Sequence, residues 1–157
     1  MNQSESIIPN AEQPSQIILL NPSDYEKWRG ENSDIDNELS QNQGFAGKPG
    51  QTAWVKSSEK LSVLVGWDGE ATLETLGNLP YKLPEGVYVV DKEIDLNAII
   101  GWGLGAYSFD RYKKPSRAPA QLEIKNQQLR EKALAIVDAV SLGRDLINTP
   151  ASDMSPS

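Results

Sequence analysis

The sequence contains no cysteine and no histidine among its 157 residues. Without cysteine the chain cannot form disulfide bonds, thiolate metal ligands or a thiol nucleophile. Without histidine it has no imidazole to ligate zinc, and no catalytic triad that uses an imidazole as its base. Few routes to catalysis therefore remain for this chain taken by itself.

Positive charge is also scarce, because 15 Lys and Arg stand against 22 Asp and Glu, which gives a formal net charge of -7. Proteins that bind nucleic acids or anionic lipids depend on clustered cations that neutralise phosphates. No such cluster interrupts the acidic background, so we expect neither a nucleic acid nor a membrane as partner. The start of the chain lacks the pattern of a signal peptide, and no run of about 18 apolar residues follows. These features predict the cytoplasm as the compartment.

Apolar residues are present in normal amount, since hydrophobic residues make up 38% of the chain. A chain of this length typically buries about 68–70% of the surface that its unfolded form exposes, which is enough for one core. Residues 1–16 are polar and contain Pro9 and Pro14, so we predict a flexible tail there. We predict that the folded α/β domain occupies residues 17–125.

Periodicity and turn residues predict strands that alternate with helices along this domain. The predicted strands are 17–20, 52–56, 61–67, 86–90 and 121–124. The predicted helices are 22–28, 34–42, 70–77, 96–109 and 127–147. Polar residues 57–60 separate two of the strands and predict an antiparallel hairpin. The pattern predicts an α/β fold, a mixed sheet of about five strands with helices on both faces.

Three alternating glycines, Gly101, Gly103 and Gly105, suggest a phosphate-binding loop, in which backbone N–H groups approach an anion. A dinucleotide fingerprint needs its glycines between a strand and a helix. Here they fall inside the helical pattern of residues 96–109. We therefore favour close packing of this helix against its neighbours.

An alternating run of carboxylates, Asp91, Glu93 and Asp95, suggests a site for a hard cation. The run lacks the glycine turn and the distal glutamate of a calcium loop. A solvated turn followed by a helix N-cap at Asp95 is the interpretation that we favour.

Residues 109–114 interleave aromatic rings with cations, as in proteins that bind single-stranded nucleic acid. One such cluster on an acidic chain is weak support for an electrostatic binder. We favour cations that interact with the preceding helix end or with acidic neighbours, and rings that pack at the domain edge. The four tryptophans lie in separate segments and are predicted to contribute to the core.

Residues 143–154, with the sequence Gly-Arg-Asp-Leu-Ile-Asn-Thr-Pro-Ala-Ser-Asp-Met, resemble the segment that joins the two domains of leucyl aminopeptidases. Ser152 stands where that family more commonly has Asn. Two upstream blocks, 44–51 and 101–112, are similar to a short bacterial branch of the same family. The resemblance covers residues 17–157.

This resemblance implies a macro-like three-layer sandwich for the amino-terminal domain, and a linker helix and domain junction over residues 126–157. It implies that a larger carboxy-terminal domain follows, which binds two divalent metals, Mn or Zn, and assembles into hexamers. The metals would activate a water for attack on the first peptide bond of a substrate. Neither metal-ligand motif of that domain, Asp-Thr-Gly-Gly or Asn-Thr-Asp-Ala-Glu-Gly-Arg, occurs here. We therefore assign no catalytic, cofactor-binding or metal-binding residue to this chain.

The expected function is that of a non-catalytic amino-terminal domain of a metallo-aminopeptidase, with a role in assembly or in access to the active site. Its expected partners are its own carboxy-terminal catalytic domain and, in the parent enzyme, further copies of the chain. Two alternatives stay open. One is a module that binds a nucleotide such as ADP-ribose, and the other is a free-standing regulatory subunit.

Overall fold

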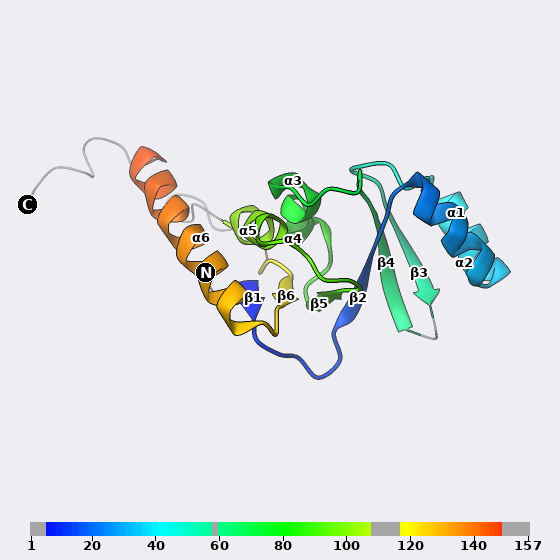
Figure 1. Ribbon diagram of the computed structural model, residues 1–157, viewed down its shortest axis with the longest axis horizontal. Helices are drawn as coiled ribbons and strands as arrows, with labels where there is room; N and C mark the ends of the chain where they lie inside the picture. Colours follow the sequence, from blue (N-terminus) through cyan, green and yellow to red (C-terminus); the bar gives the residue numbers. More distant parts are fainter. Residues whose placement is uncertain (1–5, 58–59, 108–116, 149–157) are drawn as a thin grey trace, which may run out of the picture.

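The computed structural model describes residues 6–57, 60–107 and 117–148, which form a mixed α/β domain built on one six-stranded sheet (Figure 1). The strand order is β1-β6-β5-β2-β4-β3, and every neighbouring pair is parallel except β3 and β4. The strands are β1 (Ile7–Ile8), β2 (Ser15–Leu20), β3 (Thr52–Ser57), β4 (Lys60–Gly66), β5 (Val87–Val90) and β6 (Gln121–Glu123). The predicted α/β class and the predicted hairpin are confirmed.

Helices cover both faces of the sheet, as predicted. They are α1 (Pro22–Glu31), α2 (Asp34–Asn42), α3 (Leu73–Gly77), α4 (Leu79–Lys82), α5 (Leu96–Gly105) and α6 (Gln127–Asn148). On one face, side chains of α3 to α6 pack with alternate residues of the central strands, such as Ile17 and Val63. On the other face, α1 supplies Tyr25 and Trp28 to a second core with Phe45. The sheet therefore forms the middle of three layers.

The first strand lies inside the segment that the sequence predicts to be a flexible tail. Ile7 is buried and pairs with Leu122 of β6, and the indole Nε1 of Trp102 donates to the carbonyl of Ser6 at 3.0 Å. The prediction for residues 1–16 rested on their polar overall composition and gave no weight to Ile7 and Ile8. The partner strand β6 lies far along the chain, so no local sequence pattern predicts β1. The tail prediction is wrong for residues 6–8 and for residues 15–16, which begin β2, and the sheet has six strands instead of about five.

Three helices differ clearly from the predicted ranges. Helix α1 continues to Glu31, beyond the predicted end at residue 28. The predicted helix 70–77 begins only at Leu73, after the cap Thr72, and a short helix α4 follows at Leu79. Helix α3 ends at Gly77, as predicted, and Pro80 occupies the first turn of α4, where a missing N–H costs no hydrogen bond. The predicted helix 96–109 begins at Leu96 as expected, with Asp95 as its N-cap, but α5 ends at Gly105.

Helix α6 packs along one side only. Ala133 and Val137 are fully buried against α5, whereas Ile136 and Val140, which follow at helical spacing, remain partly exposed. The carboxy-terminal half of α6 extends away from the sheet (Figure 1). Among the residues that the structure describes, no helix is long and apolar enough to cross a membrane.

Candidate functional site

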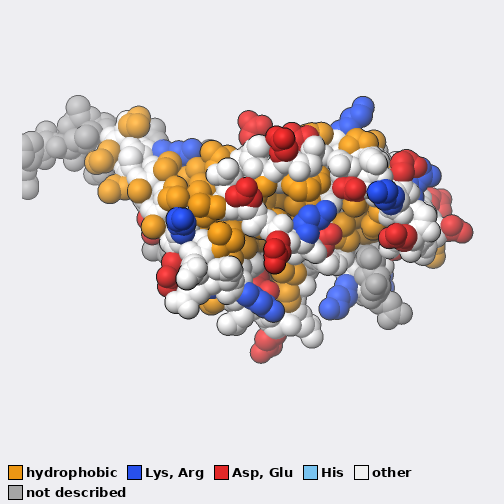
Figure 2. Space-filling model, viewed as in Figure 1, with side chains coloured by type: hydrophobic (Ala, Val, Ile, Leu, Met, Phe, Trp, Pro, Cys, Tyr) orange, Lys and Arg blue, Asp and Glu red, His pale blue; other side chains and the backbone are white. Residues whose placement is uncertain are grey.

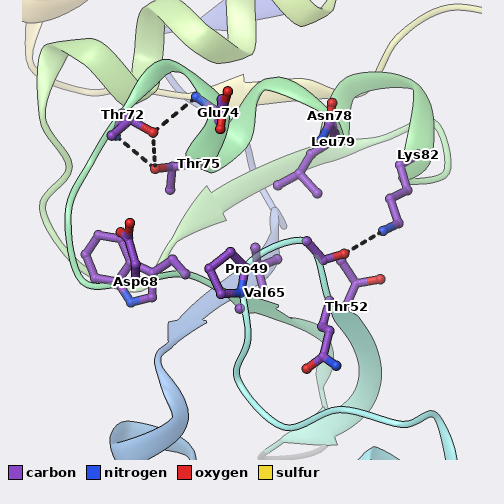
Figure 3. Close-up of a pocket in the computed structure, with 14 residues that line it drawn as sticks. Pro49, Thr52, Val65, Asp68, Thr72, Glu74, Thr75, Asn78, Leu79 and Lys82 are labelled. Atoms are coloured by element: carbon purple, nitrogen blue, oxygen red, sulfur yellow. Dashed lines mark hydrogen bonds between the residues drawn. The ribbon is translucent and has the colours of Figure 1, made fainter.

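A cavity of about 280 Å³ opens at the carboxyl end of β4 (Figure 3). After β2 the chain continues into α1 on one face of the sheet, whereas after β4 it continues into α3 on the opposite face. Open α/β sheets bind ligands in the crevice where successive connections diverge in this way. The fold therefore places a pocket where a ligand site of this architecture is expected. The sequence pattern did not predict this pocket, although polar residues directly follow the predicted strand 61–67.

The charged groups of this pocket are two carboxylates and one ammonium, Asp68, Glu74 and Lys82. The ammonium is engaged, because Lys82 Nζ donates to the carbonyl of Gly50 at 3.3 Å across one side of the pocket (Figure 3). A diphosphate carries negative charge and gains affinity from cations around it. This charge balance disfavours an ADP-ribose-like ligand.

Residues 44–51, one of the blocks that carry the family resemblance, form a tightly packed turn beside the pocket. Gln51 Oε1 accepts from the backbone N–H of Ala46 at 2.9 Å and of Lys48 at 3.2 Å. Gly47 has a φ of 82°, which L side chains rarely adopt, and a Cβ there would lie 2.7 Å from the carbonyl carbon of Asn21. Gln51 and Gly47 of this block therefore shape the backbone of the turn.

The three glycines of α5 serve close helix packing, which confirms the interpretation favoured from the sequence. A Cβ on Gly101 would lie 2.1 Å from the carbonyl oxygen of Leu73, and a Cβ on Gly105 would lie 1.9 Å from that of Gly77. On the other side of α5, a Cβ on Gly103 would lie 2.6 Å from the Val137 side chain of α6. Helices α3 and α6 can approach α5 this closely only because these positions have no side chain.

The acidic run agrees with the favoured interpretation at the N-cap Asp95, whereas the carboxyl group of Asp91 is not part of a solvated turn and binds the backbone of β2. Asp91 Oδ1 accepts from the backbone N–H of Leu19 at 3.2 Å, and Lys92 Nζ donates to the Leu19 carbonyl at 2.9 Å. Although Asp91 is exposed as a residue, desolvation of its carboxyl group raises its pKa, and the Leu19 hydrogen bond and the Lys92 charge oppose this shift. Asp95 accepts from the N–H of Asn97 at 3.4 Å and caps α5.

The donor set of the described residues does not fit a two-metal centre. Within residues 6–57, 60–107 and 117–148, no three Asp, Glu, His or Cys side chains come together in an arrangement that could hold an ion. The aromatic and cationic run 109–114 and the junction residues 149–154 lie outside the described residues. Trp28 and Trp102 are buried as predicted, while Trp54 and Trp67 pack against the core and are partly exposed.

The second candidate is the apolar surface of α6. Its largest exposed side chains are Ile147 at 83%, Leu142 at 61% and Leu146 at 54%, with Ile136 and Val140 beside them. Figure 2 shows hydrophobic side chains gathered at this end of the molecule. Clustered exposed apolar residues of this size mark interaction surfaces more often than isolated ones do.

Comparison with known proteins places the chain in a family. Residues 15–125 match the family described as M17 aminopeptidase, N-terminal domain. The chain belongs to the M17 aminopeptidases. The match coincides with the sheet from β2 to β6 and the helices between them, so the described fold is the amino-terminal domain of such an enzyme.

Two curated relatives are named probable cytosol aminopeptidases. The protein from Wolinella succinogenes is 29% identical over 167 aligned residues, which span 90% of this chain and 34% of the relative. The protein from Caulobacter vibrioides is 30% identical over 143 aligned residues, which span 71% of this chain and 28% of the relative. The chain therefore spans about a third of the length of these relatives.

Solved structures agree with the assignment to the M17 aminopeptidases. The crystal structure of the cytosol aminopeptidase from Coxiella burnetii superimposes with a TM-score of 0.82 at 30% identity, over 94% of this chain and 34% of that one. A mutant of tomato leucine aminopeptidase gives a TM-score of 0.57 at 17% identity, over 93% of this chain and 38% of that one. The tomato comparison supports the fold alone.

Proposed function

We propose that this domain has no catalytic activity of its own and serves an M17 aminopeptidase as an assembly element that docks on the catalytic domain through α6. The parent activity would remove amino-terminal residues from peptides. Support comes from the relatives, which are named aminopeptidases and are about three times as long as this chain. The catalytic chemistry would then reside in the part of such an enzyme that this chain does not cover.

The observation that carries the proposal is the exposed apolar surface of α6. Leu142, Leu146 and Ile147 are each more than half exposed, and they lie on the part of the helix that projects beyond the sheet (Figure 1). Burying one such side chain contributes about 1.5–3 kcal/mol. A docked catalytic domain would remove this surface from water, which explains why the helix carries it.

The remaining features of the proposed enzyme follow from the family and not from residues of this chain. Two divalent metals, Mn or Zn, would be held by carboxylates and a lysine of the catalytic domain and would polarise the substrate carbonyl and activate a water. The parent enzyme would be a homo-oligomer in the cytoplasm, in keeping with the naming of its relatives as cytosol aminopeptidases. A position at the entrance to the active site would add control of access to the role in assembly.

Replacing Leu146 and Ile147 together by serine tests the docking surface. In the 157-residue chain both side chains are already exposed, so the free energy of unfolding should change by no more than about 0.5 kcal/mol per site. In the native gene product the same pair should weaken the contact between the domains by about 2–4 kcal/mol, because docking buries the exposed share of each side chain, 54% for Leu146 and 83% for Ile147. Thermal unfolding and aminopeptidase rate of the native product measure this loss.

Asp138→Ser is the matched control, because Asp138 is an exposed polar residue of the same helix. It should leave both proteins unchanged. Equal stability and activity of the Leu146→Ser/Ile147→Ser protein and the control in the native gene product would contradict docking through α6. If the native gene product itself has no aminopeptidase activity, the free-standing regulatory subunit becomes the better account.

A further inference from the structure

The pocket at the carboxyl end of β4 has walls that are held in place by contacts within the chain. On one side, the turn before β3 is joined to β4, because the Gly66 N–H donates to the Gln51 carbonyl at 2.9 Å. A Cβ on Gly66 would lie 1.9 Å from the Lys48 carbonyl oxygen, so the turn and the strand are in direct contact. On the other side, the Thr72 hydroxyl accepts from the Glu74 N–H at 3.3 Å and caps α3. These contacts pre-organise the pocket, which lowers the cost of ordering it around a ligand.

The charged side chains of this pocket are separated by sign. Figure 3 shows Asp68 and Glu74 on one side and Lys82 on the other. Asp68 Oδ1 accepts from the Glu70 N–H at 3.0 Å, but within the described residues neither carboxylate forms an ion pair. Lys82 Nζ donates to the Gly50 carbonyl, which uses one of its three N–H donors. The pocket therefore offers acceptors for a cation on one side and donors for an anion on the other.

Apolar side chains line the pocket between these charged groups. Val65 and Leu79 belong to the main core and are only 2% and 3% exposed. Pro49, from the turn before β3, lies beside Val65 (Figure 3). The cavity of about 280 Å³ is slightly smaller than the usual range for ligand pockets, about 300–1,000 Å³. A ligand that fits is therefore small, with an apolar part and two opposite charges.

We propose that this pocket binds a free α-amino acid with an apolar side chain. The ammonium group of the ligand pairs with Asp68 and Glu74, its carboxylate pairs with Lys82, and its side chain contacts Val65 and Leu79. Hydrogen bonds between charged groups are stronger than those between neutral groups, so the two ends of the ligand fix its orientation. A compound with only one of the two charges leaves one side of the pocket unpaired. The proposal concerns binding by this domain and does not rest on the proposed function.

Titration of the isotope-labelled 157-residue chain with L-leucine, followed by NMR, tests this site. We expect saturable shifts at millimolar leucine, since the ligand is small and its charged partners are exposed. The shifts should centre on backbone amides of the pocket, such as those of Gly50, Gly66 and Asp68. Isopentylamine lacks the carboxylate of leucine and isocaproate lacks its ammonium group. Each should bind at least about three times more weakly than leucine, because one charged contact is lost.

Substitutions at the two sides of the pocket assign the two ends of the ligand. In Lys82→Met, leucine should lose its advantage over isopentylamine, because the partner of its carboxylate is absent. In Asp68→Asn/Glu74→Gln, leucine should lose its advantage over isocaproate for the corresponding reason. Glu93→Gln and Lys125→Met are the matched controls, since these exposed residues line a second cavity beside β5 and β6. They should leave the affinity for leucine unchanged.

Three results would overturn the proposal. The first is the absence of saturable shifts with millimolar leucine, and the second is a set of shifts confined to the second cavity. The third is unaltered discrimination between leucine and its analogues in the folded Lys82→Met and Asp68→Asn/Glu74→Gln variants, with circular dichroism to verify the fold. None of these measurements depends on aminopeptidase activity, so the proposed function stands or falls separately.

Discussion

Replacing Gly105 by alanine is expected to destabilise the domain by about 1–3 kcal/mol, the usual cost of an overpacked contact. The added Cβ would lie 1.9 Å from the carbonyl oxygen of Gly77, and this atom belongs to the backbone and cannot rotate away. Helix propensity acts in the opposite direction, since alanine is favoured over glycine inside a helix by about 1 kcal/mol. The steric conflict should outweigh it, and urea unfolding measures the net change.

Gly30→Ala provides the matched control for this prediction. Gly30 lies within α1, and a Cβ there would meet nothing within 4 Å. Only the propensity term remains, so this substitution should stabilise the protein by about 0.5–1 kcal/mol. The two glycine-to-alanine changes should therefore have opposite signs. A stabilising Gly105→Ala would contradict the close contact between α3 and α5.

Replacing Trp102 by alanine is expected to cost about 3–5 kcal/mol, as large-to-small changes of buried aromatic residues do. Trp102 has no exposed surface, and its ring centroid lies 6.5 Å from that of Tyr88. Its Nε1 also donates to the Ser6 carbonyl, which holds Ser6 and the adjoining strand β1 against α5. Chemical denaturation measures the loss of stability, and hydrogen exchange at Ile7 and Ile8 shows whether β1 is released.

Trp102→Phe separates packing from the hydrogen bond. Phenylalanine retains most of the apolar volume but has no donor, so the cost should fall to about 1–2 kcal/mol, with the hydrogen bond contributing about 1 kcal/mol. Protection of Ile7 and Ile8 from exchange should still decrease. Full protection of β1 in Trp102→Ala would show that the strand does not depend on this indole.

Local signals were sufficient for most elements of the fold. The helix of residues 34–42 and the strand pair on either side of residues 57–60 follow from capping residues, turn residues and β-branched side chains, which act over a few residues. Asp95 is an N-cap because its short acidic side chain reaches the next helical N–H groups, and that pattern is visible in the sequence.

Contacts between distant segments were beyond local reasoning. Strand β1 exists because Ile7 pairs with Leu122, and the sequence around Ile7 is too polar and too short to predict this. The structural role of Gly101 and Gly105 was inferred from their helical position, but their contacts with Leu73 and Gly77 required the folded backbone.

The pocket and the surface of α6 were likewise predictable only as far as local sequence patterns reach. The helix of residues 127–147 was predicted from the sequence, but the sequence did not show that Ile136 and Val140 stay partly exposed while Ala133 and Val137 are buried. The pocket beside Asp68 and Lys82 is lined by residues of three segments: the turn before β3, the end of β4, and the helices α3 and α4. Only the topology of the sheet brings these segments together.

The most direct test of the central claim compares two proteins in an aminopeptidase assay with a Leu-anilide substrate, the 157-residue chain and the native gene product, each with and without manganese. The proposed role predicts hydrolysis by the native gene product with manganese and none by the 157-residue chain under either condition. Metal-dependent hydrolysis by the purified 157-residue chain would contradict a non-catalytic domain.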